Sequence, residues 1–446
     1  MMAQLIQERK PLTVNPLKLS APLGAALAFL GIKGCLPLFH GSQGCTAFAK
    51  ALLVRHFREA IPMSTTAMSE VDTILGGEEN VEAAILTLVE KAQPELIGLL
   101  TTGLTETRGD DMPRILRELR RRQPQLQDLP IVLASTPDFK GSLQDGYAIA
   151  VHSLVSTLPE SPSGSVHPAQ VTVLCGPALT PADAQEIKET VEAFGLEPIL
   201  VPDPSGSLDG HLGTGFRATP DGGTPLEQLR QLGRSSLTLA IGESMRPAAQ
   251  ILAQRFGTPY RVFPHLTGLK AVDPFLATLA EHSQQSVPSR YRRQRSQVQD
   301  ALLDCHFFFG NQRIALALEA DLLWGWVDWL LDMGCQIQAA ISPTPDPHLT
   351  TLPIEAVRVG DLGDLEELAS GADLLVGNSH VARLGKRLGI PVHRIGIPIF
   401  DRLGANHLCQ VGYRGTLSQL FAVGNLLMEQ EEERHPSPSQ VSGHGF

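Results

Sequence analysis

This sequence of 446 residues contains no two cysteines spaced as C-x-x-C, and its six cysteines are scattered along the chain. The absence of such a pair argues against a self-contained zinc or ferredoxin-type site. Six isolated cysteines in a chain of this length do not make a disulfide framework either. We therefore expect the thiols to be reduced, as they are in the cytoplasm.

Long apolar runs and an excess of positive charge are also missing. No segment reaches the roughly 18 consecutive apolar residues of a membrane span. The first twenty residues carry mixed charge and lack the apolar stretch of a secretory signal. The formal net charge of −11 disfavours nucleic acid and anionic membranes as partners. These absences predict a soluble, cytoplasmic protein.

The sequence has no phosphate-binding signature. Neither G-x-x-x-x-G-K-[ST] nor a G-x-G-x-x-G between a strand and a helix occurs, although Gly213-Thr-Gly215 stands in a long loop. A nucleotide-binding function would therefore rest on analogy of fold alone, which is a weak argument.

Apolar residues make up 43% of the sequence, enough to fill several cores in a chain of this length. Strand-like and helix-like segments alternate, which predicts an α/β fold of three Rossmann-like domains with parallel sheets flanked by helices. The Pro/Ser/Gly-rich stretch 158–165 marks the first boundary. The predicted divisions are an N-terminal arm at 1–19, α/β domains at 20–165, 166–300 and 301–428, and a disordered tail at 429–446.

Two segments of the second domain stand out. The segment 202–225 is rich in glycine and proline and too long for a simple connection, so we expect a functional or a mobile loop. Residues 273–303 read as one long helical stretch. Before them, Thr180 with Asp183 three residues later predicts the capped start of a helix over 181–194.

Cys45 is the most informative residue. It follows a strand-like apolar run that ends near His40, in a loop of small residues. Glycine before it, in Gly44-Cys45, lets the backbone approach a bulky inorganic group and direct N–H donors at its sulfides. A cubane iron–sulfur cluster needs about four ligands. If Cys45 holds such a cluster, another polypeptide must supply the rest.

The other reactive side chains have simpler explanations. We expect the remaining cysteines to act as small buried hydrophobes; they are Cys35, Cys175, Cys305, Cys335 and Cys409. His40 and His56, which flank the Cys45 loop, are expected to be hydrogen-bonded structural residues rather than ligands.

Polar residues also follow a predicted strand near His380 and the Cys45 loop near Arg55. His380 follows a predicted strand, where open α/β sheets place ligands, but Ser379 as a helix N-cap explains the same run. Arg55, Arg58 and Glu59 are expected to form an ion-pair network that fixes the helix after the Cys45 loop.

An ordered set of motifs resembles the β-type chains of the nitrogenase component 1 family, from about Pro16 to Gly415. The set comprises His40-Gly-Ser-Gln-Gly-Cys45, Arg55-His-Phe-Arg-Glu59, Gly76-Gly-Glu-Glu-Asn80, Thr101-Thr102 with Gly109-Asp-Asp111, Gly377-Asn-Ser379 and Arg394-Ile-Gly-Ile-Pro-Ile-Phe-Asp401. Such a set is more specific than any single motif.

The catalytic β chains of this family give three cysteines to an eight-iron cluster, and only Cys45 matches one of them here. Ser20, or a neighbour in Ser20-Ala-Pro22, occupies the first position and Gly103 the third. This departure looks like the cofactor-assembly paralogues of the family rather than like nitrogenase itself.

The resemblance implies a scaffold for nitrogen fixation rather than a turnover catalyst, and no catalytic residue is predicted. The chain would pair with NifE in an α₂β₂ heterotetramer and share an interfacial [4Fe–4S] cluster through Cys45. A precursor of the iron–molybdenum cofactor, held mainly in the NifE chain, would be matured there and passed to apo-nitrogenase. The nitrogenase iron protein and other assembly proteins would bind transiently.

Two alternatives stay open. The chain could be a redox enzyme subunit of the same family, either the nitrogenase β chain or the B chain of light-independent protochlorophyllide reductase. It could also be a Rossmann-type nucleotide or sugar-transfer enzyme in which Cys45 is structural.

Overall fold

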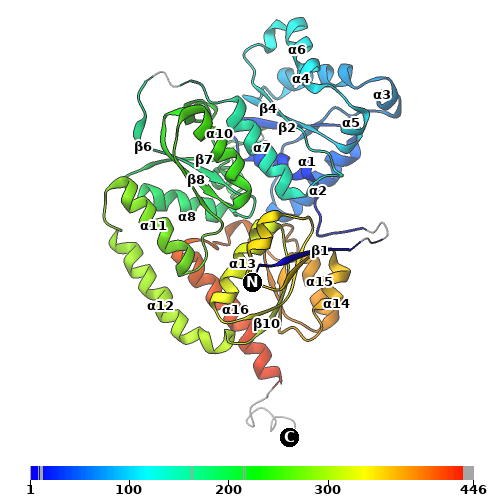
Figure 1. Ribbon diagram of the computed structural model, residues 1–446. Coiled ribbons are helices and arrows are strands. Elements are labelled where there is room, and N and C mark those ends of the chain that lie inside the picture. The colour runs from blue at the N-terminus through cyan, green and yellow to red at the C-terminus, as the bar shows by residue number, and fades with distance from the viewer. Residues whose placement is uncertain are drawn as a thin grey trace.

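Three parallel β-sheets, each flanked by helices, make up the protein (Figure 1). The computed structural model describes residues 2–8, 10, 14–161, 164–213, 215 and 217–434. The predicted class, an α/β fold with three Rossmann-like units, is confirmed. Within the described residues, no helix is both long and apolar enough to cross a membrane.

The first sheet has the strand order β3-β2-β4-β5. β4 is buried along its whole length, as its continuous apolar run Leu-Ile-Gly-Leu-Leu predicts for a strand covered on both faces. The strands are β2 (Cys35–His40), β3 (Ser64–Thr65), β4 (Leu96–Thr101) and β5 (Ile131–Ala134). The helices are α1 (Ala21–Leu30), α2 (Gln43–Phe57), α3 (Glu70–Leu75), α4 (Glu78–Lys91), α5 (Gly103–Arg108), α6 (Met112–Arg122) and α7 (Leu143–Thr157).

The second sheet has the order β7-β6-β8-β9. Its first helix begins as predicted, because Thr180 and Asp183 form a reciprocal capping box. The strands are β6 (His167–Cys175), β7 (Glu197–Val201), β8 (Ser235–Ile241) and β9 (Tyr260–Phe263). The helices are α8 (Pro181–Glu192), α9 (Leu226–Arg230), α10 (Arg246–Phe256), α11 (Leu269–Ser283) and α12 (Ser289–Phe309).

The third sheet has the order β1-β12-β11-β10-β13-β14 and includes a strand from the other end of the chain. β1 (Gln4–Gln7), within the predicted N-terminal arm, pairs in parallel with β12. The other strands are β10 (Arg313–Ala317), β11 (Gln336–Ser342), β12 (Ala356–Val359), β13 (Leu374–Gly377) and β14 (Val392–Arg394). The helices are α13 (Ala320–Asp332), α14 (Leu362–Leu368), α15 (Ser379–Leu388) and α16 (Gly412–Arg434).

Two sequence-based predictions are wrong in detail. The helical stretch 273–303 is divided between α11 and α12, because Gln284 adopts a left-handed φ of 55° and Pro288 caps the next helix. The disordered tail predicted from residue 429 is helical as far as Arg434, since its glutamates and glutamine are good helix formers and extend α16. Residues 435–446 lie outside the described part of the chain.

The segment 202–225 packs against the first domain at both ends. The N–H groups of Asp203 and Thr224 both donate to the carbonyl oxygen of Gly31, at 3.0 and 2.9 Å. Leu208 between them is buried. The ends of this loop therefore tie the second sheet to the helix α1 of the first domain.

Helices α1 and α7 cross with their backbones in contact. All ten residues of α1 are buried. A Cβ atom added at Gly24 would lie 1.8 Å from the carbonyl oxygen of Leu143, and one added at Gly146 would lie 1.8 Å from that of Ala21. Only glycine fits at these two positions, because the obstructing atoms belong to backbone.

His56 joins the first domain to the third. Its Nδ1 accepts a hydrogen bond of 2.9 Å from the N–H of Ile399, and the side chain is buried. Burial lowers the pKa of His56 to about 4. The imidazole is therefore neutral at pH 7 with its proton on Nε2, a structural role that matches the sequence-based expectation.

Replacing Gly146 by alanine is expected to lower the free energy of unfolding by about 1–3 kcal/mol, because the added methyl group forces the two helices apart. Urea unfolding followed by circular dichroism measures this change. Gly44→Ala is the matched control, since a Cβ at Gly44 meets no atom within 4 Å. Equal stability of both variants would contradict close packing of α1 on α7.

Acidification is expected to destabilise the protein through His56. Between pH 6.5 and pH 4 the unfolded imidazole binds a proton and the buried one does not, so stability falls with falling pH, by about 3 kcal/mol in all. His56→Gln keeps a hydrogen-bond acceptor and removes the titration. Urea unfolding at several pH values should show a smaller acid loss in this variant, and an identical loss would exclude His56 as a source.

Candidate functional site

The candidate site lies at the carboxyl edge of the first sheet, where β2 and β4 end side by side. His40 at the end of β2 is paired in register with Thr101 at the end of β4. Helix α2 starts three residues after His40, and α5 starts two residues after Thr101. Two helix N-termini therefore meet at this edge, where open α/β sheets bind ligands.

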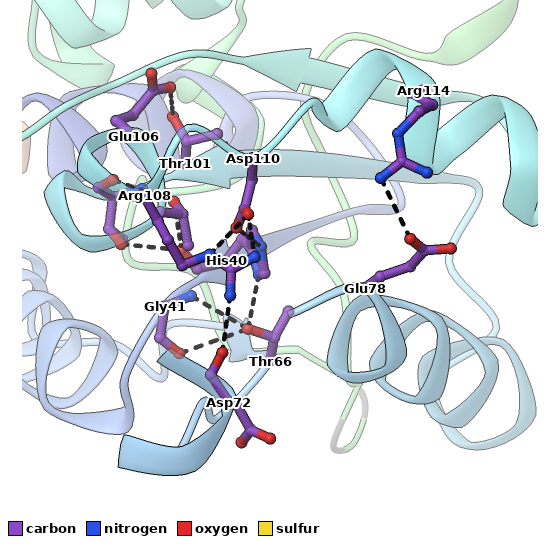
Figure 2. A network of polar contacts seen from close by, with 12 residues as sticks. His40, Gly41, Thr66, Asp72, Glu78, Thr101, Glu106, Arg108, Asp110 and Arg114 are labelled. Atoms are coloured by element: carbon purple, nitrogen blue, oxygen red, sulfur yellow. Dashed lines mark hydrogen bonds and ion pairs between the residues drawn. The ribbon is translucent and has the colours of Figure 1, made fainter. Parts of the chain in front are cut away.

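His40 is buried and holds the turn after β2 (Figure 2). Its Nδ1 lies 3.1 Å from the hydroxyl of Thr66, and its Nε2 lies 3.3 Å from a carboxylate oxygen of Asp110. The N–H of Gly41 donates to the same Thr66 hydroxyl. Burial lowers the pKa of His40, although Asp110 opposes this effect. A neutral His40 therefore donates through Nε2 to Asp110 and accepts the Thr66 hydroxyl proton at Nδ1.

The carbonyl group of His40 is also fixed, by two threonines at the start of α5. Thr102 donates its hydroxyl proton to this oxygen at 2.9 Å, and Thr105 does so at 3.3 Å. A Cβ at Gly41 would lie 2.5 Å from the Thr102 hydroxyl oxygen. The turn before α2 is therefore packed tightly against the start of α5.

Arg108 connects this network to α3. Its guanidinium pairs with Asp110 and also donates to the carbonyl oxygen of Asp72 at 2.8 Å (Figure 2). Asp110 thus contacts a histidine and an arginine at once. Asp110 was not among the predicted site residues, although the acidic pair Asp110-Asp111 shortly after a buried strand was a visible signal.

Cys45 lies in the first turn of α2 and not in a loop, which corrects the prediction. Ser42 is the N-cap residue, and helix begins at Gln43 despite the glycines around it. The Cys45 sulfur lies 3.8 Å from the Ser42 hydroxyl oxygen, and the side chain is partly exposed. The backbone N–H groups of a first helical turn have no partner within the helix and point toward its N-terminal end, where they bind anions.

The surroundings of Cys45 fit one corner of an iron–sulfur cluster. An added Cβ at Gly44 would meet no atom within 4 Å, so the space beside the residue that precedes Cys45 is open. The hydroxyl oxygen of Thr46, the next residue, is buried and has no hydrogen-bond partner among the described residues. The described residues hold no group of three or more His, Cys, Asp or Glu side chains suited to a metal, so Cys45 is not part of such a group within this chain.

The other five cysteines behave as the sequence predicts, with one difference in exposure. Cys35, Cys175, Cys305 and Cys335 are buried, and Cys409 is partly exposed. Burial raises the pKa of all five thiols, to about 12 for Cys335 and Cys409.

Ser20 and Gly103, the positions that the family resemblance matches with further cysteines of catalytic β chains, also lie at helix starts. Ser20 is the N-cap residue of α1, and Gly103 is the first residue of α5. The N–H of Gly103 donates to Asp138 at 3.1 Å. Neither residue offers a thiolate.

The predicted roles of two polar groups need correction. Asn378 rather than Ser379 caps α15, and its side-chain oxygen accepts the His380 N–H at 3.0 Å. Ser379 instead contacts Asp401. The side chain of Asn378 therefore accepts hydrogen bonds from the first N–H groups of this helix.

The ion-pair network predicted for Arg55, Arg58 and Glu59 is absent from the described residues. Arg55 lies over the ring of Phe400, and Arg58 donates to the Phe400 carbonyl oxygen. Glu59 accepts the N–H of Gly210 at 2.7 Å.

Cys45 is expected to be the first thiol alkylated by iodoacetamide in the folded chain. It is partly exposed beside open space, whereas Cys409, the other partly exposed thiol, has a pKa raised to about 12 and little reactive thiolate. Peptide mass spectrometry after timed labelling measures each rate. Labelling of Cys409 as fast as Cys45 would contradict this geometry.

Comparison with known proteins identifies the family. Residues 20–428 match the family described as Nitrogenase component 1 type Oxidoreductase. The chain is 58% identical to "Nitrogenase iron-molybdenum cofactor biosynthesis protein NifN" of Nostoc sp., over 100% of both chains, and 55% identical to the protein of that name of Rippkaea orientalis, over 99% of this chain and 100% of that one. A structure titled "Nitrogenase Cp1 at pH 6.5" superposes with a TM-score of 0.91 at 29% identity and 97% coverage of both chains. The chain therefore belongs to the nitrogenase component 1 family and, within it, to the NifN proteins.

Proposed function

We propose that this chain is a scaffold subunit for biosynthesis of the nitrogenase iron–molybdenum cofactor. It pairs with a NifE-type chain in an α₂β₂ heterotetramer and contributes Cys45 to a [4Fe–4S] cluster at the interface. A precursor cluster, bound mainly by the partner, is matured on this complex and passed to apo-nitrogenase. The names and full-length identity of its relatives support this function.

The observation that carries the proposal is the setting of Cys45. A partly exposed cysteine stands in the first turn of α2, at the carboxyl edge of a parallel sheet, beside open space at Gly44. The first-turn N–H groups of α2 suit the negative charge of a cluster and its thiolates. A [4Fe–4S] cluster holds about four ligands, and Cys45 accounts for one. The remaining ligands belong to the partner.

Exposed apolar side chains near this edge support a partner interface. Phe48, one turn after Cys45, is 81% exposed. On α3, which Arg108 ties to the site, Ile74 and Leu75 are each 81% exposed. Large apolar side chains gathered beside a functional group mark a protein contact.

The catalytic alternative is disfavoured by Ser20 and Gly103. A nitrogenase β chain would need thiolates at both positions to hold an eight-iron cluster, and neither residue supplies one. We assign no catalytic residue to this chain. Its own groups position the cluster: His40, Asp110 and Thr66 fix the turn that presents Cys45.

The proposed complex has a defined cellular setting and transient partners. It works in the reducing cytoplasm, where a free Cys45 thiol persists. The nitrogenase iron protein and further assembly proteins bind it transiently.

Cys45→Ala is expected to remove the interfacial cluster from the complex. The chain is co-expressed with its NifE-type partner and purified anaerobically, and iron, acid-labile sulfide and the electron paramagnetic resonance signal are measured. Loss of about four irons and four sulfides per heterodimer is expected, because the variant lacks the one thiolate that this chain gives to a cluster of about four ligands.

Cys409→Ala is the matched control, as it removes a partly exposed cysteine far along the chain. This control should keep the full cluster content and signal. An unchanged cluster in Cys45→Ala would refute the assignment of Cys45 as a ligand.

A further inference from the structure

Three arginines converge on one phenylalanine at the junction of the first and third domains. The guanidinium carbon of Arg55 lies 4.4 Å from the ring centroid of Phe400, and that of Arg383 lies 4.9 Å from the same centroid. Arg58 donates to the Phe400 carbonyl oxygen at 3.0 Å. We call Arg55, Arg58, Arg383 and Phe400 the Phe400 patch.

The patch gathers like charges. Because both guanidinium groups lie within 5 Å of one centroid, they are separated by no more than about the Debye length of 10 Å at 0.1 M salt and repel each other. His380 packs edge-on against the Phe400 ring with centroids 5.4 Å apart. Its pKa is lowered by burial and then by the charges of Arg383 and Arg55. The cation–π contacts with Phe400 hold the arginines there but do not neutralise them.

Among the described residues, no carboxylate lies within 4.0 Å of the guanidinium nitrogens of the patch. The adjacent carboxylate, Asp401, is already used: it pairs with Arg394 at 2.7 Å and accepts the Ser379 hydroxyl. The three arginines therefore form an uncompensated positive patch on a chain of net charge −11.

The patch continues the surface that carries Cys45. Cys45, Phe48 and Arg55 follow one another at spacings of three and seven residues and so lie along one face of α2. Phe48 and Arg55 are exposed. At 1.5 Å per residue, Arg55 is about 15 Å from Cys45 along the helix. A partner interface that extends about 15 Å from Cys45 along this face of α2 would also cover the patch.

We infer that the Phe400 patch binds an acidic segment of the partner chain. This inference rests on the function proposed above and adds the chemistry of the contact. Guanidinium groups pair with carboxylates through two parallel hydrogen bonds. One or more partner carboxylates would remove the repulsion between Arg55 and Arg383. Such charge complementarity speeds association and fixes the orientation of the two chains.

The test reverses the charge of the patch in the co-expressed complex. Arg55→Glu with Arg383→Glu is compared with Arg292→Glu with Arg293→Glu, a matched change of exposed arginines on α12. Heterodimer dissociation is measured by analytical ultracentrifugation at about 50 and 500 mM NaCl. The patch variant is expected to dissociate about tenfold more readily at low salt and to show a weaker salt dependence. The control should match the native complex.

A milder pair keeps the test decisive if charge reversal disturbs folding. Arg55→Gln with Arg383→Gln removes the charges only, and circular dichroism verifies its fold. Native-like dissociation of this folded variant would overturn the inference. Citrate protection of Arg55 and Arg383 against phenylglyoxal, together with unchanged association of the variants, would identify a small-anion site and would also overturn it.

Cluster content separates this inference from the proposed function. If Cys45→Ala loses the cluster while the patch variants associate normally, only the inference about the patch fails. If Cys45→Ala keeps the cluster, the part of the proposed function that makes Cys45 a cluster ligand fails, whatever the patch variants do.

Discussion

The buried hydrogen bonds of His40 are the constraint on which the candidate site depends. The imidazole stands between Asp110 and Thr66, and Thr66 in turn accepts the N–H of Gly41. Since burial keeps the ring neutral, each nitrogen has one fixed role, which sets the direction of the chain as it leaves β2. Helix α2 then presents Cys45 at a defined place. The thiol is positioned by polar contacts beneath it.

Local features of the sequence account for most of the fold. The capping box of Thr180 and Asp183 forms as predicted, because it depends on residues within one helical turn. The start of α2 was not predicted, because glycines have low helix propensity. The helix forms there nevertheless, because tertiary contacts at the edge of the sheet outweigh the helix propensity of its first turn. β1 was missed because four residues in a charged arm give no periodic signal.

Contacts between distant residues could not be read from the sequence. Asp110 is 70 residues from His40, and Phe400 is 345 residues from Arg55. Arg55, Arg58 and Glu59 are close in sequence and so suggested an ion-pair network. In the fold, Arg55 instead contacts the ring of Phe400, and Glu59 accepts the backbone N–H of Gly210. Cys45 could be singled out from the sequence, because its place after a strand and its glycine neighbours are local features, and its role as a cluster ligand stays a proposal. The residues that hold the turn before Cys45 could not be predicted, because they come from three separate segments of the chain.

The pairing of β1 with β12 has a consequence for how the protein is made. Gln4 lies opposite Ala356, so the first strand has no partner until about 350 more residues have been synthesised. At about 5–20 residues per second the ribosome needs tens of seconds for this length. Throughout that time β1 is unpaired. The third sheet can add β1 at its edge only after β12 has been translated. β1 is thus among the last strands to reach its native place, although it is the first strand in chain order.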